Sequence, residues 1–324
     1  MDTTDIFKPV EGKLKEFNGF FKAQMSTKVA LLDLILRYMT RRSGKQVRPG
    51  IVFLAAELCG ELNERAFVGA AMVELLHTAT LIHDDVVDSA KERRGIASIN
   101  AEWNNKIAVL VGDYLLSRGL MSAVERDEFD FLKVCSRAVK RISEGELLSM
   151  QASRKPDTDE ELYFRIIADK TASLISACSE IGAIATDASP ERRAAMRDYG
   201  EYVGIAFQIK DDVLDYTSKT KLLGKPVGND IKEKKITLPL LYFLKNSADG
   251  EAADIIKSIK KGKLSGAEIA NLINRVIKSG GIDYAEKKAR EYGEAAKNLL
   301  KDFPASEAKD SLIRLADFVT LRDK

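Results

Sequence analysis

The chain has 324 residues, of which 45% are hydrophobic and 31% are charged, a composition typical of a soluble globular protein with a substantial core. Its 51 Lys and Arg residues nearly balance its 49 Asp and Glu residues, and the net charge of +2 excludes a strongly basic surface for nucleic acid. Any recognition of phosphate must therefore depend on local groups of basic residues.

The N-terminus and the cysteines argue against a membrane protein, a disulfide-stabilised protein and a zinc protein. The segment MDTTDIFKPVEGKLKEF is charged and lacks an apolar core, and no stretch approaches the roughly 18 apolar residues of a membrane span. We therefore expect a cytoplasmic protein without a transmembrane segment. Cys59, Cys135 and Cys178 lie far apart in apolar contexts, so we expect buried thiols and neither a disulfide framework nor a zinc site.

Apolar residues recur at spacings of three and four along the whole chain, without clear strand alternation. This pattern predicts an all-α fold in a single domain, residues 1–324. The predicted helices cover residues 11–24, 27–40, 50–60, 63–89, 103–126, 130–153, 158–187, 190–217, 234–247, 251–260, 265–278, 281–301 and 305–320. The longest irregular segment, TSKTKLLGKPVGNDIKEKK at residues 217–235, is rich in Lys and Gly and predicts a mobile lid rather than a domain linker.

Two predicted helices carry aspartates in apolar surroundings. LIHDDVVD at residues 81–88 and FQIKDDVLD at residues 207–215 have the same spacing of three aspartates. Like charges one turn apart destabilise an isolated helix by a few tenths of a kcal/mol. Either cluster alone is as consistent with a solvated helix edge as with a site, but two copies flanked by Leu, Ile and Val are harder to place on a surface.

The chemistry of these clusters points to a metal ion, because buried carboxylates need cations. Aspartate oxygens without nearby His or Cys favour a hard ion such as Mg²⁺, which usually shares its coordination shell with substrate phosphate. The pair of clusters therefore predicts a diphosphate held between two helices through Mg²⁺.

Short groups of basic residues could supply direct phosphate donors, since arginine offers a planar fork and lysine a point charge. Each alone is more often a surface residue. They are Lys45 and Arg48 in GKQVRP, Arg93 and Arg94 in ERRG, Lys170 in DKTA, Lys225 in GKPVG, and Lys235 in KKITLP. GKQVRP is not a phosphate-binding P-loop, because no glycine precedes it at the required spacing and no Ser or Thr follows its lysine.

In their order and spacing these motifs, together with HTATLIHDDVVD, resemble the trans-isoprenyl diphosphate synthases, or polyprenyl synthetases, over about residues 40–240. The resemblance implies an all-α fold around a central cavity, usually as a homodimer. It implies condensation of an allylic prenyl diphosphate with isopentenyl diphosphate, with three Mg²⁺ ions bound beside the diphosphate. It leaves open a transient contact with a membrane for product release.

By motif position, the resemblance implies roles for the six aspartates. Asp84 and Asp88 would be direct Mg²⁺ ligands with Asp85 supporting them, and Asp211 would be the direct ligand of the second cluster. Asp212 and Asp215 would act through metal-bound water.

The resemblance also implies two substrate pockets. The allylic diphosphate would contact Arg93, Lys170, Lys225 and Lys235, and isopentenyl diphosphate would contact Lys45, Arg48, His77 and Arg94. Thr171 and Gln208 would line the reacting centre, where oxygen dipoles stabilise an allylic cation. His77 lies seven residues, almost two helical turns, before Asp84 and so faces nearly the same side.

The sequence departs from the family pattern at two places. Ser149 stands where a glutamine often follows the EGE element, and Gln151 comes two residues later. After the second aspartate cluster, KEKK leaves Lys235 the better match for the family's lysine, with Lys234 as a competitor.

Product length is controlled in the family partly by side chains upstream of the first aspartates. Ala79 and Thr80 lie five and four residues before Asp84, and Leu76 and Met72 lie successively deeper. Short-chain members often carry an aromatic residue there, whereas Ala79 is small and would leave a tunnel open. The resemblance therefore implies a long-chain product of about six to ten isoprene units, since one turn spans about one unit. The alternatives are that Ala79 is only a close helix contact and that the product is geranylgeranyl or farnesyl diphosphate.

Two other functions compete with the synthase. A class I terpene cyclase also ionises a prenyl diphosphate, but its second metal motif usually mixes Asn, Ser or Thr, and Glu. A non-catalytic subunit of another synthase would be expected to have lost one aspartate cluster. Both clusters are intact and all-aspartate, which favours the enzyme.

Overall fold

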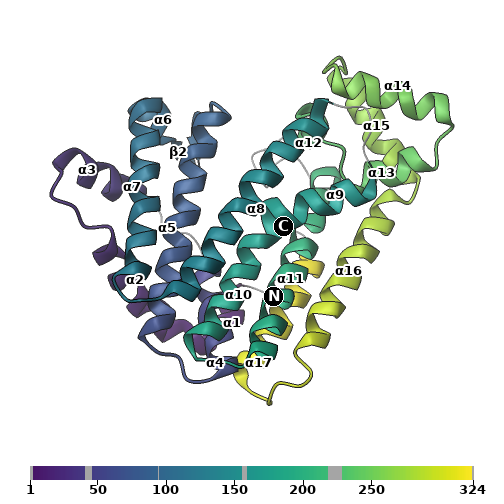
Figure 1. The fold of residues 1–324 in the computed structure, drawn as a ribbon. Coiled ribbons are helices and arrows are strands. Elements are labelled where there is room, and N and C mark those ends of the chain that lie inside the picture. Colours follow the sequence, from purple (N-terminus) through teal and green to yellow (C-terminus); the bar gives the residue numbers. More distant parts are fainter. Residues whose placement is uncertain (1–2, 41–45, 94, 155–158, 218–227, 323–324) are drawn as a thin grey trace. The chain divides into compact units, whose positions relative to one another are not determined.

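The computed structural model describes residues 3–40, 46–93, 95–154, 159–217 and 228–322. The predicted all-α fold is confirmed, because helices follow one another along the chain (Figure 1). Within these ranges the strands are limited to a small hairpin of β1 (Glu92–Arg93) and β2 (Ile96–Ala97). A hairpin with two residues in each strand is too short to produce the alternation that reveals a strand in a sequence.

The chain divides into two compact units. The first unit comprises Met1–Val139, Ala177–Arg197 and Phe303–Leu312, and the second comprises Lys140–Ser176, Asp198–Asp302 and Ile313–Lys324. The division falls within four of the described helices, which are α8 (Phe129–Arg154), α10 (Ser173–Ala185), α11 (Pro190–Thr217) and α17 (Glu307–Leu321). The prediction of a single domain therefore stays a prediction.

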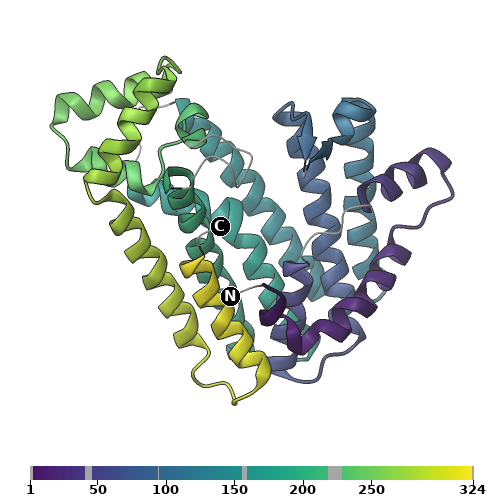
Figure 2. The same ribbon diagram turned by 180° about the vertical axis from the view of Figure 1, so that it is seen from behind.

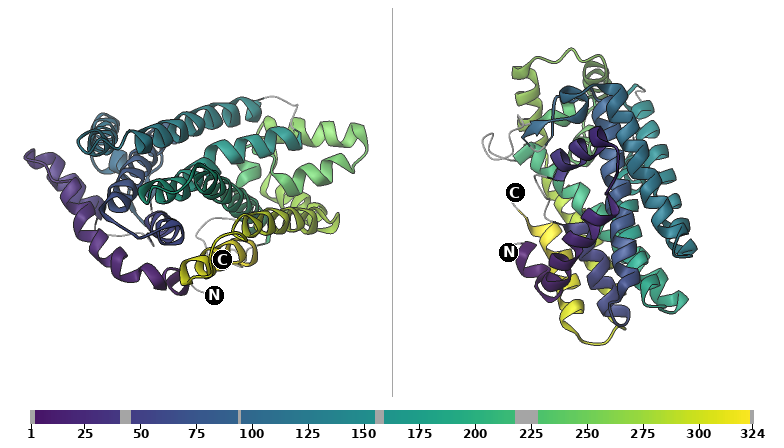
Figure 3. Two further views of the ribbon diagram at one scale, coloured as in Figure 1. Left: turned by 60° about the horizontal axis from the view of Figure 1, so that its bottom comes forward. Right: turned by 90° about the vertical axis from the view of Figure 1, so that its left-hand side faces the viewer.

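The first unit is built around two long helices that lie side by side, α5 and α7 (Figures 1 and 3). Its elements are α1 (Thr3–Ile6), the 3₁₀ turn η1 (Lys8–Val10), α2 (Glu11–Gln24), α3 (Ala30–Thr40), α4 (Val47–Cys59), α5 (Glu64–Val87), α6 (Ile99–Glu102) and α7 (Asn105–Val124). Leu75 and Ile82 of α5 share a buried cluster with Val111 and Leu115 of α7. Full burial of such a side chain stabilises the fold by about 1.5–3 kcal/mol.

The second unit contains the remaining helices. They are α9 (Glu160–Ile167), the π-helical turn η2 (Ala168–Ala172), α12 (Asn229–Lys232), α13 (Leu238–Lys245), α14 (Asp249–Lys260), α15 (Gly266–Lys278) and α16 (Gly281–Leu299). The part of α17 that belongs to this unit packs along α16 (Figure 2), where Lys297 Nζ lies 2.8 Å from Asp317 Oδ1. The helix predicted at residues 158–187 is thus interrupted by η2, which the apolar spacing did not reveal.

Local capping explains where several helices begin. The side chain of Asn104 accepts a hydrogen bond from the Ile107 amide (2.9 Å), and that of Asp159 accepts one from the Leu162 amide (2.7 Å). Such caps pair the amides that have no partner within the helix. The helix predicted at residues 234–247 begins later in the structure, because α13 starts at Leu238. Pro239 therefore lies in its first turn, where a missing N–H costs little.

The segment predicted as a lid is only partly described. Residues 218–227 lie outside the described residues, whereas Asn229–Lys232 form α12.

Two helices are long and apolar enough to cross a membrane by length and composition, which inspection of the sequence did not identify. Their most apolar windows, in α5 and α7, have mean hydropathies of 1.4 and 1.5, and 61% and 39% of these windows are buried within the protein. Since α5 also carries Glu74, His77 and two of the aspartates, and α7 shares a buried cluster with it, we interpret both as core helices of the first unit.

The three cysteines are confirmed as buried and without disulfides. Burial raises the pKa of the Cys59 thiol to about 11 and that of Cys178 to about 12. Since the thiolate is the reactive form, none of these thiols is poised for nucleophilic chemistry.

Candidate active site

The first aspartate cluster lies where α5 ends. Asp84 is half-buried, Asp88 is exposed, and the Asp88 amide closes the last turn on the Asp84 carbonyl at 2.8 Å. Asp85 is only 4% exposed. The carboxylates of Asp84 and Asp88 are therefore more accessible to an ion from solvent than that of Asp85.

Asp85 is bound by Arg93 from the hairpin. Arg93 Nε lies 2.8 Å from both carboxylate oxygens of Asp85, and Nη2 lies 2.6 Å from Oδ1. The hydrogen bond to Asp85, followed by the charges of the three aspartates, raises the pKa of Arg93 above its ordinary value although burial opposes this. Arg93 therefore fixes the hairpin to the end of α5, which fits a supporting role for Asp85.

The same end of α5 holds the segment that follows the hairpin. Asn100 Nδ2 donates to the backbone carbonyls of Asp85 (3.1 Å) and Ala90 (3.0 Å), and Ser98 Oγ donates to Ala90 O at 2.6 Å. These bonds fix the backbone that carries Asp88. Arg94, predicted beside Arg93, lies outside the described residues.

The residues predicted for isopentenyl diphosphate lie on α4 and α5. Arg48 is half-buried, and its buried Nε atom has no hydrogen-bond partner in the described parts of the chain. Such a donor suits an anion. His77 is half-buried in α5, whereas Lys45 lies outside the described residues.

His83 has a structural role. Its Nε2 atom lies 3.5 Å from Asp113 Oδ1 and 3.4 Å from Val109 O, both on α7. The ring therefore joins two helices of the first unit.

The predicted chain-length residues all lie on α5, where Met72, Leu76 and Ala79 are buried and Thr80 is half-buried. Ala79 packs in the apolar cluster shared with α3 and α7, and Thr80 Oγ1 donates to His77 O at 2.8 Å. These contacts agree with a close helix contact at Ala79, and a product tunnel along this side stays a prediction.

The second cluster lies near the end of α11, where neighbouring aspartates have opposite surroundings. The Asp211 side chain is 42% exposed and pairs with Arg322, whose guanidinium also stacks over the Phe207 ring, with 3.9 Å from Cζ to the ring centroid. Asp212 is 4% exposed and accepts hydrogen bonds from Tyr163 Oη (2.7 Å) and Gln208 Nε2 (2.8 Å).

Burial, together with the charge of Asp230, raises the pKa of Asp212 from 3.8 to about 8, although the two hydrogen bonds oppose this. Asp215 has a third kind of surroundings. Its carboxylate accepts hydrogen bonds from the backbone amides of Asn229 and Asp230, at 3.2 Å each, and so caps α12. Asp211 therefore presents a more accessible carboxylate than Asp212, and its role as the direct ligand stays a prediction.

Lys170 and Thr171 lie in the π-helical turn η2. Thr171 Oγ1 donates to Gln208 Oε1 at 2.9 Å, which extends the chain of hydrogen bonds from Asp212 through Gln208, and Lys170 pairs with Glu146 of α8. The second unit thus joins Thr171, Gln208 and Asp212 through hydrogen bonds, with Lys170 next to Thr171 in the sequence. Their roles stay predictions.

The competing lysines, Lys235 and Lys234, differ in their contacts, and the choice of Lys235 stays a prediction. Lys235 lies among carboxylates. Its Nζ atom lies 3.8 Å from Asp230 Oδ1 and pairs with Glu233. Burial alone would lower the pKa of Lys235, but the hydrogen bond and charge of Glu233 and the charge of Asp230 raise it. Lys234 instead has its side chain near Gly262. Lys225, the remaining lysine predicted for the allylic diphosphate, lies outside the described residues.

Sequence reasoning missed Tyr163, Asp230 and Arg322. Tyr163 lies 49 residues before its partner Asp212. Arg322 lies 111 residues from Asp211, so no local pattern could connect them.

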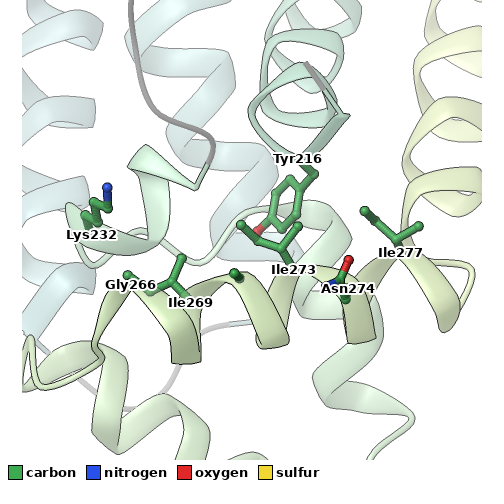
Figure 4. A pocket seen from close by; sticks show the side chains of 8 residues that line it. Tyr216, Lys232, Gly266, Ile269, Ile273, Asn274 and Ile277 are labelled. Carbon is green, nitrogen blue, oxygen red and sulfur yellow. The ribbon is translucent and has the colours of Figure 1, made fainter. Parts of the chain in front are cut away.

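The second unit has a pocket of about 310 Å³ that is separate from the predicted site residues. It is lined by Tyr216, Lys232 and six residues of α15, among them Ile269, Ile273 and Asn274 (Figure 4). None of the predicted site residues lines it.

The predicted metal ligands fit a hard cation in their chemistry, since all are carboxylates. Within the described ranges, no group of three or more His, Cys, Asp or Glu side chains is arranged to hold a metal ion alone.

The polyprenyl synthetase family model matches residues 29–276 of the chain. The chain belongs to this family. An all-trans-nonaprenyl-diphosphate synthase (geranyl-diphosphate specific) of Rhodobacter capsulatus is 42% identical over 313 residues, 96% of this chain and 95% of the relative. A short chain isoprenyl diphosphate synthase of Methanothermobacter thermautotrophicus is 35% identical over 292 residues, 88% of this chain and 89% of the relative.

A polyprenyl synthase of Caulobacter crescentus, solved in complex with calcium and isoprenyl diphosphate, has a TM-score of 0.91. It is 35% identical, and the match covers 100% of this chain and 98% of that one. The resemblance in the motifs is thereby confirmed at the level of family and fold, and the polyprenyl synthetase described here is a prenyltransferase.

Proposed function

We propose that this polyprenyl synthetase uses Mg²⁺ to condense an allylic prenyl diphosphate with successive isopentenyl diphosphate units, giving an all-trans product of about six to ten units. The observation that carries the proposal is the pair of aspartate clusters, each with an accessible carboxylate at Asp84 and Asp211 beside a buried, hydrogen-bonded one at Asp85 and Asp212. Asp84, Asp88 and Asp211 are the proposed ligands. Three ions would match the family.

The substrates need direct donors as well as metal ions. Lys170 and Lys235 would bind the allylic diphosphate, and both are paired with carboxylates that a polyanion could replace. Arg48, with its buried Nε donor, and His77 would bind isopentenyl diphosphate. The substrate contacts proposed for Lys45, Arg94 and Lys225 rest on motif position alone.

The reaction follows from charge. When the allylic carbon–oxygen bond breaks, negative charge develops on the diphosphate and positive charge on the carbon skeleton. Bound Mg²⁺ would neutralise the leaving group. The Thr171 and Gln208 oxygens, already joined to each other, would face the cation, and basic side chains would hold the anion. Attack by the double bond of isopentenyl diphosphate and loss of a proton to the released diphosphate give a product one unit longer.

Long-chain synthesis is the preferred specificity, because Ala79 is small and the nonaprenyl synthase relative is more similar than the short-chain one. A geranylgeranyl or farnesyl diphosphate synthase is the alternative. A cyclase is disfavoured by the all-aspartate second cluster, and a non-catalytic subunit by the presence of both clusters.

The remaining features of the proposal concern the whole protein. A single domain is supported by four helices that belong to both units and by a family match that includes residues of both. We also propose a soluble, cytoplasmic homodimer with transient membrane contact during product release. Exposed apolar side chains on α7, among them Leu110 and Met121, support a surface covered by a second copy.

The test is incubation with labelled isopentenyl diphosphate and an allylic starter, with and without a chelator. Product length is then read by mass spectrometry. The expected result is elongation to about six to ten units that stops on chelation and resumes when Mg²⁺ is restored. Full turnover under chelation would contradict the metal role, and a product of three or four units would establish the short-chain alternative.

A further inference from the structure

The π-helical turn η2 carries two residues of the proposed reaction, Lys170 and Thr171. A π turn inserts one extra residue into a helix, and such turns often occur at functional sites. The wider turn needs support from its neighbours, which the second unit supplies from α8 and α11.

Arg141 of α8 binds both the turn and α11. Its Nε atom donates to Asp169 Oδ1 at 2.7 Å, and its Nη1 and Nη2 atoms donate to the two carboxylate oxygens of Glu201 at 2.7 and 2.9 Å. The side chains of Arg141, Asp169 and Glu201 are 26%, 18% and 26% exposed. Paired, bidentate contacts of this kind are strong and directional, so the guanidinium fixes the residue immediately before Lys170.

Two glycines allow the backbone of η2 to approach both helices. A Cβ atom on Gly145, one turn after Arg141, would lie 2.9 Å from Lys170 N, and one on Gly204, one turn after Glu201, would lie 2.5 Å from Ala172 Cα. Real Cβ atoms do not approach other atoms so closely. The turn is therefore enclosed by a clamp that consists of Arg141, Gly145, Glu201 and Gly204.

The clamp determines which groups the turn presents. Glu146, next to Gly145, pairs with Lys170, and Gln208, four residues after Gly204, accepts the hydrogen bond of Thr171. A shift of η2 relative to α8 and α11 would move the Lys170 ammonium and the Thr171 hydroxyl together.

We propose that Arg141 is a positioning residue for prenyl transfer, which holds η2 so that Lys170 can bind the allylic diphosphate and Thr171 can face the reacting carbon. The proposal rests on the function proposed above, because Lys170 and Thr171 take their roles from it. Arg141 is assigned no contact with substrate, because its Nε, Nη1 and Nη2 atoms each donate to Asp169 or Glu201.

The first experiment separates the two substrates. In Arg141→Met, kcat/KM for geranyl diphosphate is expected to fall about tenfold to a hundredfold, because small displacements of positioning groups have effects of that order. The KM for isopentenyl diphosphate should change little. Arg141→Lys should stay impaired, since one ammonium cannot reproduce the guanidinium fork. The matched control is Arg137→Met, one turn earlier on α8, which loses an ion pair with Glu180 and should keep wild-type kinetics.

The second experiment tests whether Arg141 acts through Lys170. If it does, Arg141→Met causes a smaller loss in a Lys170→Ala background than in the wild type, because the part of its effect that passes through Lys170 is already gone. Losses that multiply in the double variant would overturn the proposal, as would kinetics of a folded Arg141→Met that match those of Arg137→Met.

The third experiment does not depend on activity. Amide hydrogen exchange in residues 168–172 should be faster in Arg141→Met and in Gly145→Ala than in Arg137→Met, because both changes loosen the turn. Gly145→Ala keeps the charged groups of Arg141, Asp169 and Glu201. If Arg141→Met does not fold, the kinetic measurements are made on Gly145→Ala instead. Unchanged exchange in both variants would overturn the clamp, whereas failure of the wild-type protein to elongate any starter would overturn the proposed function alone.

Discussion

Asp211 and Asp212, adjacent residues on α11, show how burial gives two chemically identical side chains different properties. Asp212 is enclosed and accepts hydrogen bonds from Tyr163 and Gln208, and its raised pKa favours the protonated form near neutral pH. Asp211 is 42% exposed and pairs with a cation, Arg322. A carboxylate that exchanges one cation for another is better suited to metal binding than one held in the core, so we expect the two aspartates to contribute differently to turnover.

Substitution of a proposed ligand should mainly affect the chemical step. Asp211→Ala and Asp84→Ala are expected to lower kcat by roughly 10²–10³-fold, the size of effect seen when one group that stabilises developing charge is removed. Steady-state kinetics check this, with Asp33→Ala as a control that removes an aspartate from an exposed ion pair on α3. Near-normal turnover in Asp211→Ala would show that the second cluster has been assigned wrongly.

Arg48→Ala should separate binding from chemistry. Loss of a hydrogen bond to a charged group costs about 1.5–3 kcal/mol, so the KM for isopentenyl diphosphate should rise at least about tenfold while kcat changes little. Initial rates at varied concentrations of each substrate provide the measurement. An equal rise in the KM for the allylic substrate would contradict the assignment of Arg48 to one pocket.

Arg322 competes with any ion that binds Asp211, because its guanidinium pairs with that carboxylate. Arg322→Met should strengthen binding of Mn²⁺ to the substrate-free protein by about two- to fivefold, as expected for a partly exposed ion pair worth up to about 1 kcal/mol. Titration followed by electron paramagnetic resonance measures the affinity. Lys297→Met, which breaks an ion pair with Asp317 in the same unit, should leave it unchanged, and equal effects of the two substitutions would argue against direct competition.

At the scale of the helix, the helical period of α11 places residues of the clamp and of the second aspartate cluster on one side. Glu201, Gly204, Gln208 and Asp211 are separated by three or four residues and so follow one side of the helix. Apolar spacing predicted this helix as residues 190–217, and the structure has it as Pro190–Thr217. The π turn could not be predicted in the same way, because it depends on Arg141 and two glycines of other helices rather than on its own five residues.

The aspartate clusters were found from their repeated spacing within one helix, and Lys170 and Thr171 from a motif of adjacent residues. Tyr163 and Arg141 were missed because their roles come from contacts across 49 and 60 residues of sequence. Local patterns therefore identified the groups proposed to meet substrate but not those that hold them in place.

The α5 helix provides a test of product length. Ala79→Tyr should shorten the main product to about three or four units while initial condensation continues, because the ring would block growth about one turn from Asp84. Mass spectrometry of the products decides this. Since Ala79 is buried against α3 and α7, a thermal melt must accompany it to exclude overpacking. An unchanged long product from a folded, active variant would place the tunnel elsewhere.

At the scale of the whole molecule, the exposed apolar residues of α7 require an explanation. Leu110 is 55% exposed, Met121 44% and Val124 42%, although the opposite side of this helix is packed against α5. A second copy of the chain is the partner that the family resemblance implies.

We therefore expect the protein to sediment as a dimer with twice the 35.9 kDa mass of the chain, and Leu110→Glu to shift it toward the monomer at micromolar concentration. A charge buried in an apolar interface is costly unless it is paired, which gives the direction of the effect. Ile277→Glu is the matched control, because it replaces an exposed apolar residue of α15 and should leave the dimer intact. Analytical ultracentrifugation distinguishes the outcomes. A monomeric wild-type protein would refute the homodimer, and dissociation in Ile277→Glu but not in Leu110→Glu would move the interface from α7 to α15.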